Sequence, residues 1–74
     1  MSDCAELRFD LLGRTYRNGR RWAVIRIRYA DIIGLIDYSE WREEYRFCPE
    51  GGYAFDAAQL GEIAAFLRER NQEP

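Results

Sequence analysis

The stretch YRFCPEGGYAFDAAQLGEIAAFLRERN, residues 45–71, changes its hydrophobic period part-way along its length. Before Pro49, apolar residues alternate with polar ones, which is typical of a strand with one buried face. After Phe55, apolar residues recur at every third or fourth position, which is typical of an amphipathic helix. The stretch therefore predicts a strand that leads through a glycine-containing turn into a C-terminal helix over about residues 56–70.

Capping residues mark the start of this helix. Asp56 is a good N-cap, and Gln59 three positions later completes a capping-box pattern. Phe55 and Leu60 occupy the two positions of a hydrophobic staple. The stripe predicted to face the core consists of Leu60, Ile63, Ala64 and Leu67.

Alternation with a period of two also runs through the first half of the chain. It places Leu7, Phe9 and Leu11 on one face of a first strand. The Asn18-Gly19 pair then predicts a type I′ hairpin turn, because both central residues of that turn need a positive φ. A second strand is predicted over residues 22–29.

Two further strands are predicted before the helix. The first of them begins near Asp31, after a turn or bulge at Ala30-Asp31, and the second covers residues 41–48. Gly34, inside the earlier strand, indicates a bulge or a close approach by another backbone. Trp41 and Phe47 are predicted to pack in the core or at an interface.

The predicted fold class is α+β: a four-stranded antiparallel β-meander with one C-terminal helix packed on one face. The 74 residues form a single domain, with the sheet at about 6–48 and the helix at about 56–70. The chain has eleven aromatic residues, more than one helix is able to cover. We therefore expect a homo-oligomer, most simply a two-fold dimer that uses a sheet face or a sheet edge.

An arginine block, RTYRNGRRWAVIRIRY at residues 14–29, contains six of the eleven arginines and no acidic residue. If the large apolar residues of the strands face the helix, the block's arginines point away from it. The apolar set is Phe9, Ile25, Ile27, Tyr29, Tyr45 and Phe47. The opposite face then presents Trp22, Arg26, Arg28, Arg42 and Arg46.

Two interpretations of these arginines remain open. In the first they are solvated and pair across strands with Asp37, Glu43 and Glu44. In the second they form an anion site, because guanidinium groups bind phosphate bidentately and stack on flat rings. The candidate ligand-binding residues are Arg26, Arg28, Arg42 and Arg21, with Trp22 as the stacking surface.

The charge distribution restricts the kind of partner. Residues 14–28 carry a net charge of +6 and residues 29–50 one of −4, and the whole chain carries −2. This split suits a small anionic ligand, such as a phosphate-bearing nucleotide, or a charged protein surface. It does not suit a long nucleic-acid duplex, whose binding proteins are usually basic overall.

The composition argues against catalysis. The chain has no histidine for general acid–base work and no lysine for a Schiff base. No phosphate-binding glycine loop is present, and Cys48, without a histidine partner, is interpreted as a small buried hydrophobic residue. Two cysteines without a CxxC pair do not predict a zinc site. We therefore expect no enzyme activity, no metal and no cofactor.

Localisation is predicted from two features of the sequence. The N-terminal residues MSDCAELRF show neither a basic region nor a long apolar run, so they do not predict a signal peptide. No stretch approaches the roughly 20 apolar residues that a membrane helix needs. The expected location is the cytoplasm, where Cys4 and Cys48 would be free thiols.

Residues 31–70 resemble a group of small proteins common in phage and prophage genomes. Those proteins combine a D-I-x-G-x-I strand, a W-R-x-x-Y-x-F-x-P strand and an L-x-x-I-A-x-F-L helix. The matching positions are Asp31, Ile32, Gly34, Ile36, Trp41, Arg42, Tyr45, Phe47, Pro49, Leu60, Ile63, Ala64, Phe66 and Leu67.

The resemblance implies a phage setting, in which short non-enzymatic proteins often counteract host antiviral defence. Within that setting, the first hypothesis is an oligomer that sequesters a nucleotide signal with arginines and aromatic residues. The second is an inhibitor that binds a host defence protein, such as a CRISPR effector, in the cytoplasm of the infected cell. The third is a phage accessory or structural protein.

Overall fold

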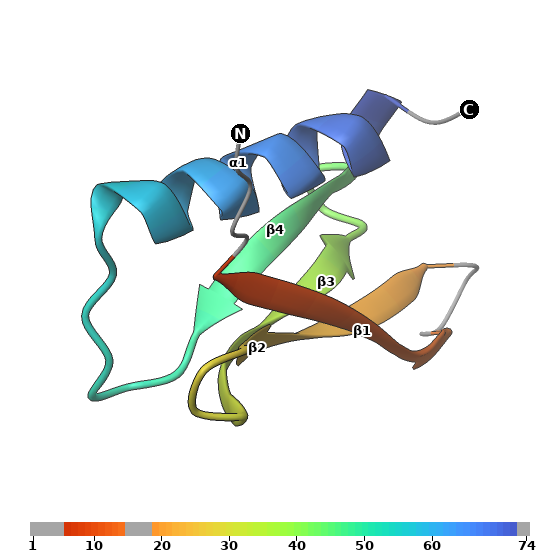
Figure 1. Ribbon diagram of the computed structural model, residues 1–74. Helices are drawn as coiled ribbons and strands as arrows, with labels where there is room; N and C mark the ends of the chain where they lie inside the picture. Colours follow the sequence, from red (N-terminus) through yellow and green to blue (C-terminus); the bar gives the residue numbers. More distant parts are fainter. Residues whose placement is uncertain (1–5, 15–18, 73–74) are drawn as a thin grey trace.

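The computed structural model describes residues 6–14 and 19–72 (Figure 1). Four antiparallel strands form one sheet in the order β1-β2-β3-β4, and a single helix follows them. The bounds are β1 (Leu7–Arg14), β2 (Arg20–Arg26), β3 (Asp31–Ser39), β4 (Glu44–Pro49) and α1 (Ala57–Gln72). The α+β fold predicted from the sequence is confirmed.

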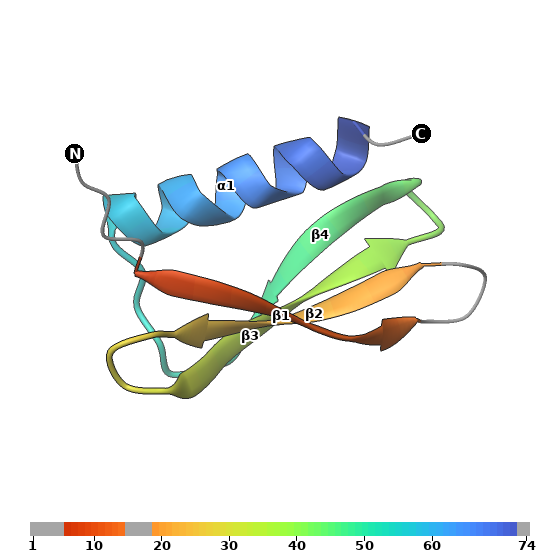
Figure 2. The ribbon, with the colours of Figure 1, turned by 45° about the vertical axis from the view of Figure 1, so that its right-hand side comes forward.

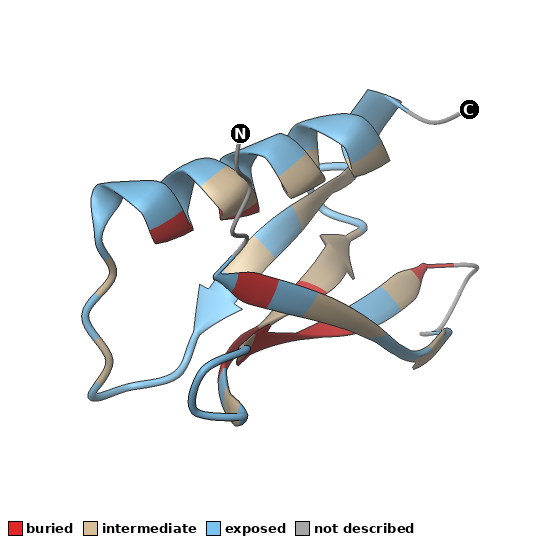
Figure 3. Ribbon diagram, in the orientation of Figure 1, coloured by how far each residue is buried: buried red, intermediate tan, exposed pale blue. Residues whose placement is uncertain are grey.

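The helix lies across one face of the sheet, and the chain between β4 and α1 loops out to reach it (Figure 2). The core forms between helix and sheet, and its buried residues are concentrated in β2 and β3 (Figure 3). The buried core cluster consists of Leu7, Trp22, Val24, Ile33, Ile36 and Ile63.

The predicted capping box is confirmed at the start of α1. The Gln59 N–H donates to Asp56 Oδ1 at 2.8 Å, and the Asp56 N–H donates to Gln59 Oε1 at 3.2 Å. The buried stripe differs from the prediction, because Leu60 is half exposed and Ala64 is exposed. Ile63 is buried as predicted, and the partly buried Phe66 packs against the same core, where its ring stacks on Phe9 at 4.2 Å.

The prediction of which β2 side chains face the helix is wrong. Val24 pairs with Phe9 across the β1–β2 ladder, so Val24 and its neighbour Trp22 at i−2 share the helix-facing side with Phe9. Ile25 pairs with Arg8 and therefore lies on the side away from the helix, although it is also buried. Four consecutive residues of β2, from Trp22 to Ile25, are buried, so β2 has no single apolar face.

The second strand is also shorter than predicted. It ends at Arg26, and residues 27–30 form a turn in which Ala30 has a φ of 57°. Ile27 and Tyr29 therefore lie in the turn with half or more of their surface exposed, and neither covers the helix side of the sheet. The predicted turn before Asp31 is confirmed. The predicted hairpin turn at Asn18-Gly19 falls partly outside the described residues.

Gly34 confirms both features that its position in the strand predicted. The β2–β3 register shifts between Val24 and Ile25, next to the partner of Gly34. A Cβ built on Gly34 would lie 2.5 Å from a ring carbon of Phe47 and 2.8 Å from the carbonyl oxygen of Cys48. The neighbouring strand β4 therefore packs directly against the bare backbone of β3.

Two predictions about β4 need correction. The strand begins at Glu44, so Trp41 lies in the preceding turn, where 92% of it is exposed. Trp41 therefore does not pack in the core, whereas Phe47 packs against it as predicted. Cys48 is an exposed free thiol on the sheet side opposite to Phe47, so the prediction that it is buried is wrong. Cys4 lies outside the described residues.

Candidate functional site

An open pocket of about 770 Å³ lies where the β2–β3 turn meets the start of α1. We call it the turn pocket. Arg26, Arg28 and Tyr29 line it from the sheet side, and Phe55 and Asp56 line it from the helix side. The turn after β2 brings these arginines to the helix N-terminus, because the chain reverses there and does not continue as a strand.

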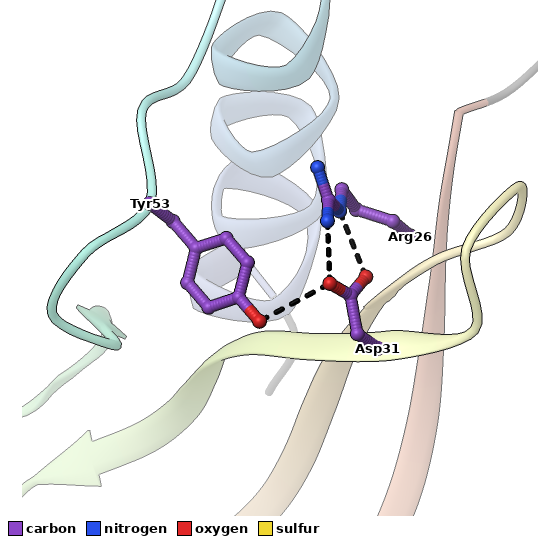
Figure 4. A network of polar contacts seen from close by, with 3 residues as sticks. All are labelled: Arg26, Asp31 and Tyr53. Atoms are coloured by element: carbon purple, nitrogen blue, oxygen red, sulfur yellow. Dashed lines mark hydrogen bonds and ion pairs between the residues drawn. The ribbon is translucent and has the colours of Figure 1, made fainter.

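Arg26 is held in a network of polar contacts beside this pocket (Figure 4). Its Nε donates to Asp31 Oδ1 at 2.8 Å, and its Nη2 donates to Asp31 Oδ2. The Tyr53 hydroxyl donates to the same Oδ2 at 3.1 Å. The guanidinium carbon also lies 4.4 Å from the Tyr29 ring centroid and 5.2 Å from that of Tyr53. Arg26 thus ties the β2–β3 turn to the segment before α1.

The network shifts the acidity of its members. The hydrogen bonds from Arg26 hold the pKa of Asp31 below its usual value of 3.8, and the Tyr53 hydroxyl acts in the same direction. The hydrogen bond to Asp31 in turn raises the pKa of Tyr53. Asp31 is therefore ionised throughout the neutral range, and its charge offsets that of Arg26.

Asp31→Asn is expected to lower the urea midpoint at neutral pH and to flatten the acid dependence of stability. The folded-state pKa of Asp31 is below the unfolded one, so its contribution is complete above about pH 4 and is lost as the pH falls through the folded-state pKa. Urea titrations at about pH 7 and about pH 2.5 test this. The control is Asp37→Asn in the exposed Arg21–Asp37 pair; an equal effect there would contradict the prediction.

Arg28 differs from Arg26 in having no hydrogen-bond or ion-pair partner among residues 6–14 and 19–72. It is exposed at the rim of the turn pocket, next to Tyr29, of which 61% is exposed. The same pocket contains the carboxylates of Glu6 and Asp56. The turn pocket therefore offers one unpaired guanidinium and one exposed ring within a surface of mixed charge.

The other two arginines of the predicted site lie elsewhere. Arg21 pairs with Asp37 at 3.0 Å, and Arg42 contacts Glu44 at 3.4 Å in the β3–β4 turn. The nine residues of β3, or roughly 26 Å, separate that turn from the turn pocket. The structure thus brings Arg26 and Arg28 together and leaves Arg21 and Arg42 in exposed surface pairs. The predicted pairing across strands is confirmed for Asp37, whereas Glu44 contacts an arginine only two residues before it in the chain.

Trp22 is not placed as a stacking surface for a ligand, which corrects the sequence-based interpretation. Only 6% of Trp22 is exposed. Its ring meets Phe66 and Tyr45 edge-on, with centroids 5.1 and 5.3 Å apart, and the guanidinium carbon of Arg20 lies 5.3 Å from its centroid. The tryptophan is therefore part of the helix–sheet core.

Trp41 is almost fully exposed to solvent, more so than Tyr29. It lies in the turn between β3 and β4, which we call the hairpin tip (residues 40–43). The Arg42 N–H donates to Ser39 Oγ at 3.3 Å, and Glu43 adopts a positive φ of 56°. The sequence does carry a signal for this position, because Trp41 directly follows the predicted Ser39-Glu40 turn.

Neither a metal site nor a membrane helix is found within the described part of the chain. No group of three or more residues with metal-binding side chains is assembled there. α1 falls short of the length and apolar character that a membrane-crossing helix needs. Comparisons with protein families, with curated proteins and with solved structures find no match to this chain.

Proposed function

We propose that this chain is a small non-enzymatic binding protein that attaches to another protein through its hairpin tip. The observation that carries the proposal is the 92% exposure of Trp41. A tryptophan in contact with a partner buries about 150–250 Å², and tryptophan is enriched among the residues that dominate binding energy. Its nearly full exposure leaves the whole ring available for contact with a partner.

The surroundings of Trp41 support this function. Glu40, Arg42 and Glu43 flank it, so an apolar anchor is surrounded by charged side chains, as at the centre and rim of protein interfaces. The turn is fixed by the Ser39–Arg42 hydrogen bond, which lowers the entropy lost when the tip binds. The exposed ring is therefore presented from a preformed turn.

The resemblance to phage and prophage proteins supports a partner class. The shared positions include Trp41 and Arg42, both at the hairpin tip, and no packing contact in the core accounts for either of them. We infer that the partner is a host defence protein, such as a CRISPR effector, and that binding in the cytoplasm of the infected cell inhibits it.

Trp41→Ala is expected to weaken partner binding by about 30-fold or more, which corresponds to the loss of at least about 2 kcal/mol. Its free energy of unfolding should change by less than about 0.5 kcal/mol, because Trp41 is exposed. The measurement is cross-linking and quantitative mass spectrometry in cells with an active defence system, with affinities then measured on the purified partner.

The matched control for this experiment is Leu60→Ala, which removes a half-exposed apolar side chain on a different element. The Leu60→Ala protein should still bind the partner that the Trp41→Ala protein no longer binds. Equal recovery of the same defence protein with wild type and Trp41→Ala would overturn the proposed function.

A second candidate function is sequestration of a phosphate-bearing nucleotide in the turn pocket. The observation in its favour is that Arg26, Arg28 and Tyr29 line one pocket. Arg28 would bind the phosphate and Tyr29 would stack on the base. Arg26 would act by positioning Tyr29, since Asp31 already neutralises its charge.

Arg28→Ala is expected to abolish nucleotide binding without changing the melting temperature, because Arg28 is exposed and unpaired among the described residues. Calorimetry against cyclic dinucleotides, cyclic ADP-ribose isomers and short oligonucleotides is the measurement. Arg68→Ala, on the exposed side of α1, is the control. If no compound binds below about 100 μM, this second function is rejected.

A further inference from the structure

The two edges of the sheet differ in how their outward backbone groups are occupied. In an antiparallel ladder, alternate residues of an edge strand point their N–H and C=O groups away from the sheet. The Tyr45 N–H bonds a side chain of α1, so the backbone groups of Tyr45 point away from β3. The alternation then makes Phe47 and Pro49 the other outward-facing residues of β4. Asn71 accepts from the Tyr45 N–H at 2.6 Å and donates to its carbonyl at 3.3 Å, and Pro49 has no N–H. The β4 edge is thus occupied at Tyr45 and lacks a donor at Pro49, which leaves the open N–H at Phe47.

On β1 the same alternation identifies different outward residues. The Glu6 carbonyl accepts from Ile27 and so points toward β2. The Leu7 N–H points the other way and donates to Glu62 Oε1 at 3.0 Å. Phe9 and Leu11 follow Leu7 in steps of two, so their N–H and C=O groups also point outward. Within the described residues, these groups have no hydrogen-bond partner.

The open part of this edge has defined limits. Glu62 occupies the edge at the Leu7 N–H, and the β1–β2 register shifts between Leu11 and Gly13. The regular edge is therefore the five residues Leu7–Leu11, and Phe9 is its midpoint. A strand that adds to this edge must pair within that short segment.

We propose that two copies of the chain pair antiparallel through β1, about a two-fold axis at Phe9. Phe9 then faces Phe9 of the second copy, and Leu11 of each copy faces Leu7 of the other. Two hydrogen bonds form between the Phe9 backbones. One further hydrogen bond runs from each Leu11 N–H to the Leu7 carbonyl opposite, and each Leu7 N–H exchanges Glu62 for the Leu11 carbonyl opposite. The two sheets become one of eight strands, with both helices on the same side.

Charge complementarity selects this register. With the axis at Phe9, Arg8 of each copy lies opposite Asp10 of the other, so the two existing Arg8–Asp10 pairs merge into an alternating group of four charges. Moving the axis by one residue places Arg8 opposite Arg8, or Asp10 opposite Asp10. Like charges directly opposite each other are destabilising, so both neighbouring registers are disfavoured.

The pairing also covers apolar surface that the single chain leaves in water. Leu11 is 59% exposed, although it shares the helix-facing side of the sheet with the buried residues Leu7 and Trp22. In the proposed dimer its side chain packs beside Leu7 of the second copy. This surface is distinct from the hairpin tip, so a dimer presents two copies of Trp41 at once.

The test uses charge reversal and mixing. Arg8→Asp leaves acidic residues at positions 8 and 10 of both copies, and Asp10→Arg leaves arginines at both positions. Like charges then face each other across the dimer, so each variant alone should dimerise at least about tenfold more weakly than wild type. An equimolar mixture of the two variants restores both Arg–Asp pairs between the copies, and should therefore associate more tightly than either variant alone. Sedimentation velocity over a concentration series measures all four samples, with circular dichroism to confirm that each variant is folded.

The matched control is Arg68→Asp, which changes the net charge as Arg8→Asp does but lies on the exposed side of α1, away from the sheet edge. It should dimerise like wild type. The proposal is overturned if wild type remains an 8.8 kDa monomer at about 200 μM, a concentration that would populate any useful dimer. It is also overturned if the two charge-reversed variants, each folded, do not associate when mixed.

Discussion

Trp22→Ala is expected to lower the free energy of unfolding by about 3–5 kcal/mol. Only 6% of Trp22 is exposed, and its ring contacts both α1, through Phe66, and β4, through Tyr45. Its removal therefore loosens the helix and the edge strand together. A single core in a chain of this length rarely supplies more than about 3–5 kcal/mol of stability, so much of the variant should be unfolded at physiological temperature.

Urea titration followed by far-ultraviolet circular dichroism is the measurement, and two variants provide controls. Trp22→Phe retains an aromatic ring beside Phe66 and should recover part of the loss. Trp41→Ala removes the same side chain from the exposed hairpin tip and should shift the midpoint little. Equal midpoints for Trp22→Ala and wild type would show that Trp22 is not a core residue and would restore its earlier interpretation as an exposed stacking surface.

The elements of the fold were predictable from the sequence because each carries a local signal. The capping box at Asp56 and Gln59 fixes where α1 begins, and period-two alternation identifies β1. Gly34 carried a specific signal as well, since a glycine in a strand indicates a bulge or close packing. Both occur there.

The orientation of β2 was not predictable from periodicity. Trp22 and Val24 on one side and Ala23 and Ile25 on the other are all buried, so both phases of the alternation are apolar. A central strand that is buried on both faces reads as a continuous apolar run. Only the pairing of Phe9 with Val24, which requires the register, decides which side meets the helix.

The candidate site depended on turn lengths that the sequence did not reveal. Because β2 ends at Arg26, the turn places Asp31 directly opposite it, and the two form a cross-strand ion pair. The period-two alternation predicts a β2 that extends to Tyr29, which would place Arg26 and Arg28 on an open sheet face. A turn at residues 27–30 places Arg26 opposite Asp31, and would therefore predict the ion pair between them. Tyr53 has no sequence signal, because the loop that carries it to Asp31 is irregular.

Gly34→Ala is expected to lower the free energy of unfolding by about 3 kcal/mol, at the upper end of the usual effect of overpacking. The added methyl would lie 2.5 Å from the ring of Phe47 and 2.8 Å from the backbone carbonyl oxygen of Cys48. Phe47 is held in place by its edge-on contact with Phe55, whose ring centroid is 5.5 Å away. The carbonyl belongs to the residue that pairs with Leu35, so moving it disturbs the β3–β4 ladder.

Gly61→Ala is the control, because it makes the same chemical change where there is room for it. No atom lies within 4 Å of a Cβ built on Gly61, and the residue is exposed in α1. Replacing a glycine inside a helix by alanine should raise stability by about 0.5–1 kcal/mol. Urea titrations of the two variants should therefore shift in opposite directions. A Gly34→Ala protein as stable as wild type would mean that Phe47 and β4 can move away from β3, and that close packing at Gly34 does not fix the edge strand.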